Sequence, residues 1–468
     1  MNKDDQVLKS RDDKIPVVVT RASDTGDATE SFKLAEGSTC SWAKSGETLG
    51  TAKLRERIEP WLTALFQSEH FALLVGSGLT HAVHHIATGN LLPGMAPAEF
   101  GELDAKIKAA AEESAARAAR EEGNIEDQIR VANELLLGVE ILAGQDEGML
   151  NQAGSLKATL KKVLAKFAAD ILQGENGLIT AQDDKLESAF NYLVSFLMSF
   201  ASRTGTRDRL QIFTTNYDRY IEAGAEIAGL HLLDRFVGSL APIFRSSRLD
   251  IDMHYNPPGI RGEPRYLEGV AKFTKLHGSM DWVYVDRNIR RIALPFGVES
   301  IEPYLNAPGL AGADAQQLMI YPNSAKDRET ASYPYVELFR DFAAAICRPN
   351  STLVSFGYSF GDEHLNRVIE DMLTIPSTHL VVISYSDPLG RIMETYRRIG
   401  RHAQITLLIG NHVGDFSILI DNYLPKPAID RNTIRMAELL KSRWGTGRAD
   451  ASKNNNDETQ DATVQTPQ

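Results

Sequence analysis

Four short apolar stretches, each closed abruptly by glycine or small polar residues, constrain the fold of this chain more than any other feature. They cover residues 71–80, 210–218, 270–279 and 351–359. Runs of β-branched and aromatic residues that stop at turn residues are typical of buried strands. Helical patterns separate the stretches, and further strands are expected at 379–387 and 403–410. Strands that alternate with helices predict an α/β fold with a doubly wound parallel sheet and right-handed crossovers.

The stretch from Leu210 to Asp218 ends in Thr215-Asn216-Tyr217-Asp218. In an open α/β sheet, ligands bind just outside the carboxyl ends of the strands. We therefore expect Thr215, Asn216 and Asp218 to lie at a ligand crevice. An Asx-turn that only closes the strand is the alternative, because Asn and Asp favour such turns without any ligand.

The first stretch runs into Gly76-Ser77-Gly78-Leu79-Thr80. Glycine permits positive φ and close backbone approach, and a helix that follows such a turn directs its N–H groups and positive dipole end at the turn. This pattern predicts a phosphate site. It is neither a Walker A loop nor a GxGxxG fingerprint. A plain tight turn between strand and helix is the alternative.

The other two strand ends carry His277-Gly278 and Gly357-Tyr358-Ser359. His277 is interpreted either as a core histidine that donates one hydrogen bond or as a proton acceptor at the crevice. Histidine suits both roles, because its reference pKa near neutrality lets the ring donate a hydrogen bond or accept a proton.

Composition excludes several protein classes. The formal net charge of −12 argues against a basic footprint for nucleic acid, so we expect no direct nucleic-acid binding. Two cysteines, Cys40 and Cys347, are too few for a four-cysteine zinc site or a disulfide framework. The sequence has no apolar run of about 18 residues and no secretory signal, so we expect a cytoplasmic protein without membrane contact.

Three segments are predicted from composition and helical periodicity. Residues 1–45 are polar and are expected to be flexible. Residues 46–444 form the folded domain, with a helical insertion at about 101–205 whose helices are separated by glycines, among them Gly154 and Gly174. Residues 445–468 are rich in Asn, Asp, Thr and Gln and are expected to be disordered. Pro60 is expected to kink or split a helix over 51–66.

The four motifs, in this order, resemble those of the sirtuin superfamily, whose pattern is a Gly-Ala-Gly loop, Thr-Gln-Asn-x-Asp, His-Gly and Gly-x-Ser. The resemblance covers residues 71 to 410 without the insertion, and it is greatest to the divergent bacterial branch found in anti-phage defence. Ser77 replaces the usual Ala and Thr215 the usual Gln. The resemblance implies a Rossmann-like, NAD-binding domain.

One departure from the family pattern concerns the reaction class. Sirtuin deacetylases carry a four-cysteine zinc module soon after His-Gly, whereas only Cys347 follows here. The resemblance thus implies hydrolysis of NAD+ to nicotinamide and ADP-ribose, without a zinc module or any metal, instead of lysine deacylation.

The resemblance also implies roles for single residues. Asn216 would position the ribose and a water molecule. Asp218 would hydrogen-bond the nicotinamide amide or order Asn216, and His277 would accept a proton. The implied NAD-contacting set is Gly76, Ser77, Gly78, Thr80, Thr215, Tyr217, Gly357 and Ser359.

Partners follow only from the resemblance. It implies a toxic effector that depletes NAD during phage infection, works as a homo-oligomer, and acts with a hexameric HerA-type ATPase or responds to a phage component. Two alternatives remain open. One is a non-catalytic regulatory subunit that binds NAD or ADP-ribose, and the other is a protein ADP-ribosyltransferase.

Overall fold

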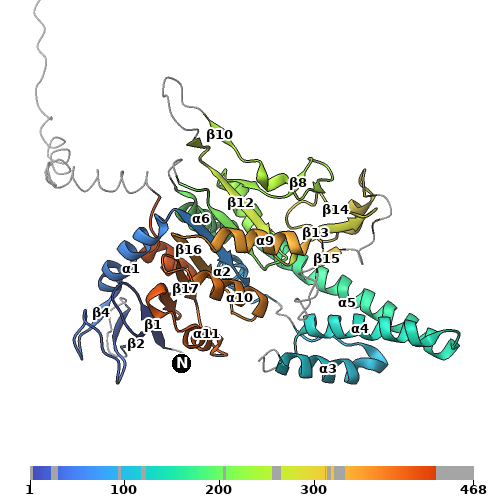
Figure 1. Ribbon diagram of the computed structural model, residues 1–468, viewed down its shortest axis with the longest axis horizontal. Coiled ribbons are helices and arrows are strands. Elements are labelled where there is room, and N and C mark those ends of the chain that lie inside the picture. Colours follow the sequence, from blue (N-terminus) through green and yellow to red (C-terminus); the bar gives the residue numbers. More distant parts are fainter. Residues whose placement is uncertain are drawn as a thin grey trace, which may run out of the picture. The chain divides into compact units, whose positions relative to one another are not determined.

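A computed structural model describes residues 4–22, 30–92, 96–117, 123–203, 207–255, 265–310, 313, 318–320 and 333–427 (Figure 1). All but the last two of these residues belong to one compact unit, residues 1–425. The tail predicted at 445–468 and residues 428–444 of the predicted folded domain lie outside the described residues.

An 11-stranded mixed sheet runs through the described part of this unit, and the seven strands from its β7 edge to β18 are parallel. Their order is β7 (His231–Leu233), β12 (Val270–Lys275), β6 (Gln211–Thr214), β5 (His70–Val75), β16 (Ser351–Phe356), β17 (His379–Ser384) and β18 (Ile405–Ile409). All four apolar stretches of the sequence are strands of this sheet, so the predicted α/β fold with a parallel sheet is confirmed.

Helices cover both faces of the sheet because side chains alternate along each strand. On β5, Leu73 and Val75 pack into one buried cluster, while Ala72 and Leu74 pack into another. The first cluster includes α1 (Thr51–Phe66), α2 (Ser77–Thr88), α6 (Asp183–Ala201) and α7 (Tyr220–Ile227). The second includes α9 (Tyr335–Ile346), α10 (Glu363–Leu373) and α11 (Arg391–Ile399).

The prediction of a flexible segment over residues 1–45 is wrong for its described part. Strand β1 (Asp5–Lys9) pairs antiparallel with β18 and extends the sheet through β2 (Val17–Arg21), β3 (Ser31–Leu34) and β4 (Leu49–Gly50). The polar composition suggested an exposed segment, but polar side chains of this segment are buried and hydrogen-bonded. Lys9 Nζ donates to the carbonyls of His402 and Ile405 at 2.6 and 3.0 Å, as burial of an ammonium group requires.

Three long helices occupy most of the predicted insertion: α3 (Asp104–Arg117), α4 (Ile125–Ala143) and α5 (Glu147–Ile179). The expected breaks at Gly154 and Gly174 are wrong, since α5 runs through both. A Cβ at Gly174 would lie 2.8 Å from Leu92 Cδ2, and one at Gly177 would lie 3.0 Å from His84 Cε1 of α2, whereas one at Gly154 would meet nothing within 4 Å. Close packing against α2 therefore explains glycine at this end of α5 better than a helix break.

The last helix of the predicted insertion, α6, packs in the core of the sheet domain, where Leu193 and Phe196 are fully buried. Pro60 does not split α1, which is continuous over 16 residues. Pro60 lies on the exposed face of α1. The Glu56 carbonyl, which an N–H at position 60 would otherwise reach, accepts from Arg11 Nη2 at 2.7 Å instead.

A smaller antiparallel sheet is built from strands on both sides of β12 in the chain. Its order is β15 (Leu318–Ile320), β13 (Gly278–Val285), β14 (Asn288–Arg291), β9 (Ile243–Phe244) and β8 (Phe236–Val237). Strands β13 and β14 form an antiparallel hairpin, whose turn places Asp286 and Arg287 at φ of 47° and 62°. A third buried cluster joins this sheet to α4 and α5.

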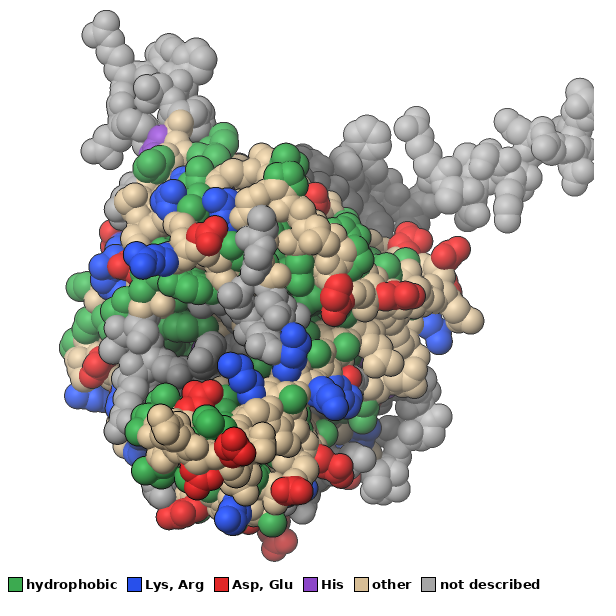
Figure 2. Space-filling view, turned by 90° about the vertical axis from the view of Figure 1, so that its right-hand side faces the viewer, with side chains coloured by type: hydrophobic (Ala, Val, Ile, Leu, Met, Phe, Trp, Pro, Cys, Tyr) green, Lys and Arg blue, Asp and Glu red, His purple; other side chains and the backbone are tan. Residues whose placement is uncertain are grey.

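The remaining elements are short. They are β10 (His254–Tyr255), β11 (Arg265–Tyr266), α12 (Phe416–Ile418), a π-helical turn at Leu419–Tyr423, and 3-10 turns at Gly101–Leu103, Arg248–Asp250, Glu302–Asn306 and His402–Gln404. Within the described ranges no helix has both the length and the apolar character needed to cross a membrane. Acidic and basic side chains are interspersed on the face drawn in Figure 2.

Candidate active site

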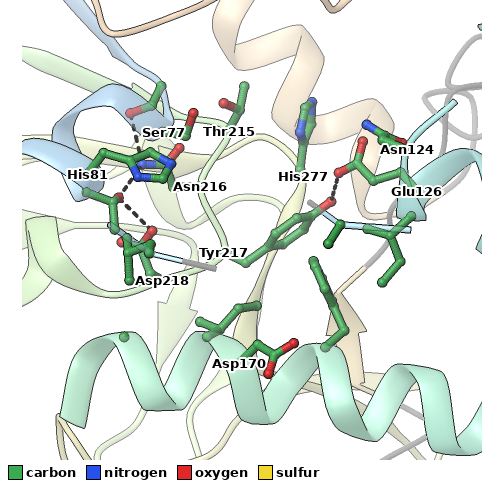
Figure 3. A pocket seen from close by; sticks show the side chains of 18 of the residues that line it. Ser77, His81, Asn124, Glu126, Asp170, Thr215, Asn216, Tyr217, Asp218 and His277 are labelled. Carbon is green, nitrogen blue, oxygen red and sulfur yellow. Dashed lines mark hydrogen bonds between the residues drawn. The ribbon is translucent and has the colours of Figure 1, made fainter. Parts of the chain in front are cut away.

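A cavity of about 850 Å³ lies at the carboxyl ends of β5, β6, β12 and β16. The insertion forms its other wall through α4 and α5 (Figure 3). Ten of the eleven predicted site residues line it: Gly76, Ser77, Thr80, Thr215, Asn216, Tyr217, Asp218, His277, Gly357 and Ser359. The volume is within the range of about 300–1,000 Å³ for small-molecule sites. Motifs separated by up to 283 positions in sequence, from Gly76 to Ser359, thus meet in one place.

Gly78 is the predicted site residue that does not line the cavity. Its N–H donates to the carbonyl of Gly357 at 3.1 Å, and the N–H of Gly76 donates to that of Phe356 at 2.9 Å. A Cβ on Gly78 would lie 2.6 Å from Gly357 Cα. The two loops therefore require glycine so that their backbones can touch, and these two N–H groups are not available to a phosphate. Ser77 is exposed at the first turn of α2.

Asn216 is 8% exposed, and its side-chain amide has a defined orientation. Nδ2 donates to the carbonyl of Gly76 and to Thr80 Oγ1, both at 3.0 Å. Because a carbonyl can only accept, the amide nitrogen must point toward Gly76. Among the described residues nothing donates to Oδ1, which leaves this oxygen as the acceptor that Asn216 can offer to a ligand.

Asp218 stabilises the orientation of the Asn216 side chain through Thr80. Its Oδ2 accepts a 2.8 Å hydrogen bond from Thr80 Oγ1, and its Oδ1 accepts one from the Tyr220 N–H at 3.2 Å. Burial raises the pKa of Asp218, and the Lys275 ammonium group opposes that rise. Lys275 Nζ itself donates to the Asp218 carbonyl and, at 2.9 Å, to Glu222 Oε1. The Asn216 loop is thus fixed by buried charged and polar groups.

Tyr217 and His277 lie on the other side of the cavity. His277 is 6% exposed, and its ring centroid is 6.5 Å from that of Tyr217. Tyr217 is also buried, and its hydroxyl donates to Glu126 Oε1 at 3.1 Å. Burial and the Glu126 carboxylate raise the pKa of Tyr217 well above its usual value. Tyr217 remains a neutral donor, and it ties the Asn216 loop to the first turn of α4 (Figure 3).

Several lining residues have no signal in the motifs. His81 on α2, Glu126 on α4 and Lys162 and Lys166 on α5 line the cavity, as does Arg391 on α11. Burial lowers the pKa of His81, so its ring is held neutral, while nearby Asp218 opposes this. The insertion residues could not be found from sequence because their helices show only amphipathic periodicity, which does not reveal what one helix faces.

Arg219 is another residue without a motif signal. It follows Asp218 and forms a buried ion pair with Glu175 of α5, with a backbone N–H to Oε1 distance of 2.9 Å. Its guanidinium also donates to the carbonyls of Leu294 and Pro295. A buried ion pair needs such added hydrogen bonds to offset desolvation. The pair joins the Asn216 loop to the insertion at a second point.

Comparison with protein families gives one match, to the model of the SIR2-like domain over residues 210–407. The matched range extends from β6 into β18 and contains Asn216, His277 and Gly357. It begins after the Gly76 turn and α2, and it does not include them. No curated protein matches the sequence. SIR2-like domains bind NAD, and the match, together with the α/β fold, supports a sirtuin-like superfamily member with an NAD-related activity.

Proposed function

We propose that this protein hydrolyses NAD+ at the bond between nicotinamide and the ribose C1′ atom. The single observation that carries the proposal is the orientation of Asn216, whose amide oxygen is left to the cavity by the bonds of its nitrogen to Gly76 and Thr80. The SIR2-like match supports NAD as the ligand.

The proposed reaction needs orientation and charge more than a strong nucleophile. The C1′–N bond breaks, nicotinamide leaves as a neutral molecule, and a water oxygen bonds to C1′. The transition state resembles an oxocarbenium ion, and a site that is complementary to it accelerates the step. Asn216 Oδ1 would accept a hydrogen bond from the water or from a ribose hydroxyl. His277 would accept the proton that the water loses.

The pyrophosphate would lie at the N-terminus of α2. Ser77 is exposed there, and the dipole of a 12-residue helix favours an anion at its first turn. Arg391 lines the same cavity beside Ser359 and Gly361 and supplies a full positive charge. The helix N-terminus and Arg391 would therefore bind the diphosphate. The Gly76 and Gly78 N–H groups are not available, because they donate to backbone carbonyls of the protein.

The proposed cellular role is a toxic effector of a bacterial anti-phage system, held inactive until infection. Such an enzyme needs control, since continuous NAD loss would kill its host. We propose that it assembles as a homo-oligomer, with a hexameric ATPase or a phage component as the trigger. The contact between Tyr217 and Glu126 supports this role, because it gives the insertion a direct path to the site.

Nicotinamide release from NAD+ by the purified protein tests the proposal. The matched pair is Asn216→Ala and Asn90→Ala, since Asn90 is an exposed asparagine just after α2. Release that falls at least about 100-fold in Asn216→Ala alone is expected, a size typical of a lost transition-state contact. Equal release by both variants would remove Asn216 from the mechanism.

The same assay separates the alternatives. Free ADP-ribose identifies a hydrolase, and ADP-ribose that stays attached to protein identifies a transferase. A shift in thermal unfolding by NAD without turnover, in the presence and absence of the candidate ATPase, identifies a regulatory subunit. We favour hydrolysis because Asn216 and His277 both line the cavity.

A further inference from the structure

Three metal-ligand side chains converge beside the cavity, and only one of them has a role in the proposed reaction. They are His277, Asp362 and His364, and one potential ligand atom from each lies within 4.8 Å of the other two. His277 follows β12, while Asp362 and His364 belong to the cap and first turn of α10. The two histidine rings have centroids 5.6 Å apart.

We propose that this group binds a Zn²⁺-type divalent cation, and that the bound cation inhibits the enzyme by taking the lone pair of His277. The binding site stands on the geometry of the three side chains. The inhibition rests on the proposed hydrolase function, in which His277 accepts a proton.

The donor set suits zinc. Two imidazoles and one carboxylate with an open fourth position are a common Zn²⁺ ligand set, whereas Mg²⁺ prefers oxygen ligands alone. Zinc bonds of about 2.0–2.1 Å in a tetrahedron place the ligand atoms about 3.3 Å apart. Binding would require side-chain rotations in the half-buried Asp362 and His364 to bring the ligand atoms from within 4.8 Å to about 3.3 Å apart. The open position faces the cavity, because His277 and Asp362 line it.

Local charge also favours a cation. The Asp362 carboxylate contributes to the raised pKa of Tyr217 and of Tyr358, so its negative field extends over this side of the cavity. Glu126, which accepts from Tyr217, adds a second carboxylate on the same side. The opposing charges that line the cavity are Arg391, Lys162 and Lys166. A metal bound by His277 and Asp362 would compete with substrate at this side.

Direct binding tests the site whether or not the protein turns over NAD. Untagged protein is stripped with chelator and titrated with Zn²⁺ by calorimetry, and Co²⁺ is followed by its visible absorption. We expect one ion per chain, a tetrahedral Co²⁺ spectrum, and affinity reduced at least tenfold in both His364→Gln and Asp362→Asn. His231→Gln is the matched control, because exposed His231 pairs with Val270 at the opposite end of β12. Its affinity is expected to be unchanged.

The activity measurement uses His364→Gln, because His364 is not among the residues that line the cavity. Its turnover without metal is expected to equal that of the unmodified protein, while at least tenfold more Zn²⁺ is needed to inhibit it. Absence of stoichiometric binding, or equal affinity in His364→Gln and His231→Gln, would overturn the site. Binding that depends on His364 in a protein that shows no turnover, even with the candidate ATPase present, would retain the site and remove the hydrolase proposal.

Discussion

The hydroxyl of Thr80 donates a 2.8 Å hydrogen bond to Asp218 Oδ2 across 138 residues of sequence. The same oxygen accepts from Asn216 Nδ2 at 3.0 Å. Because a hydroxyl has one proton, its donation to the carboxylate leaves only lone pairs for Asn216, and the whole chain of bonds has one direction. Asp218 therefore orients Asn216 through Thr80.

The first prediction follows from this relay. Thr80→Val keeps the shape of the side chain and removes the hydroxyl. We expect kcat for nicotinamide release to fall about 10- to 100-fold with little change in KM, since misplacement of a positioned group affects the transition state most. Buried groups left without a partner also cost about 1–3 kcal/mol in unfolding free energy.

Thr80→Ser is the conservative control, since it restores the hydroxyl. Steady-state kinetics and chemical denaturation of both variants measure the effect. Loss of stability in Thr80→Val without a change in kcat would show that Thr80 has only a structural role.

A second prediction concerns the contact between the glycine loops. The added methyl group of Gly78→Ala meets the Gly357 backbone, and overpacking of this kind costs about 1–3 kcal/mol. The matched control is Gly138→Ala in α4, where an added Cβ meets nothing within 4 Å. That change is expected to stabilise the protein by about 0.5–1 kcal/mol, because alanine is the better helix former. Denaturation midpoints of Gly78→Ala and Gly138→Ala that shift in the same direction would contradict this account.

A third prediction tests the link between the Asn216 loop and the insertion. Tyr217→Phe removes the hydroxyl that donates to Glu126 Oε1. We expect hydrogen exchange over α4 to accelerate about tenfold, which corresponds to one hydrogen bond to a charged group. Tyr284→Phe is the control, since Tyr284 is 45% exposed on β13. Unchanged exchange in Tyr217→Phe would show that α4 is held by its apolar contacts alone.

A fourth prediction concerns pH. Burial, with the nearby Lys9 charge, lowers the pKa of His379 from 6.5 to about 4. His379 Nε2 lies 2.8 Å from Thr406 Oγ1, which also accepts from Trp61 Nε1 at 2.9 Å, so the neutral ring accepts from Thr406. Between these pH values His379 is protonated in the unfolded chain and neutral in the folded protein. Unfolding free energy should therefore fall as the pH drops from about 6.5 to about 4, by up to about 3 kcal/mol.

His379→Gln isolates that contribution, because glutamine can accept from Thr406 and does not titrate. Its unfolding free energy should depend less steeply on pH between about 4 and 6.5, and the two proteins should run parallel above pH 7. Denaturant titrations at a series of pH values provide the measurement. Identical pH slopes would assign the acid sensitivity to other groups.

The central strands and their polar ends could be predicted because the signals are local. Apolar runs closed by turn residues identified β5, β6, β12 and β16, and the rule that ligands lie at the carboxyl ends of parallel strands brought their motifs together. Ten of the eleven residues named from the strand ends and from the family resemblance line one cavity. Gly78 differs because a glycine suits both phosphate binding and backbone packing, and only a neighbouring strand decides between them.

The sequence by itself thus determined the α/β class, the order of the motifs and the residue types at the strand ends. Only the tertiary structure decided that β1 joins the edge of the sheet, that α5 passes through its glycines, and that Glu126, Lys162 and His364 approach the same cavity. The reason is physical. Strand and helix periodicity depend on neighbours in sequence, whereas a wall of a cavity depends on which surfaces are buried together by residues far apart in the chain.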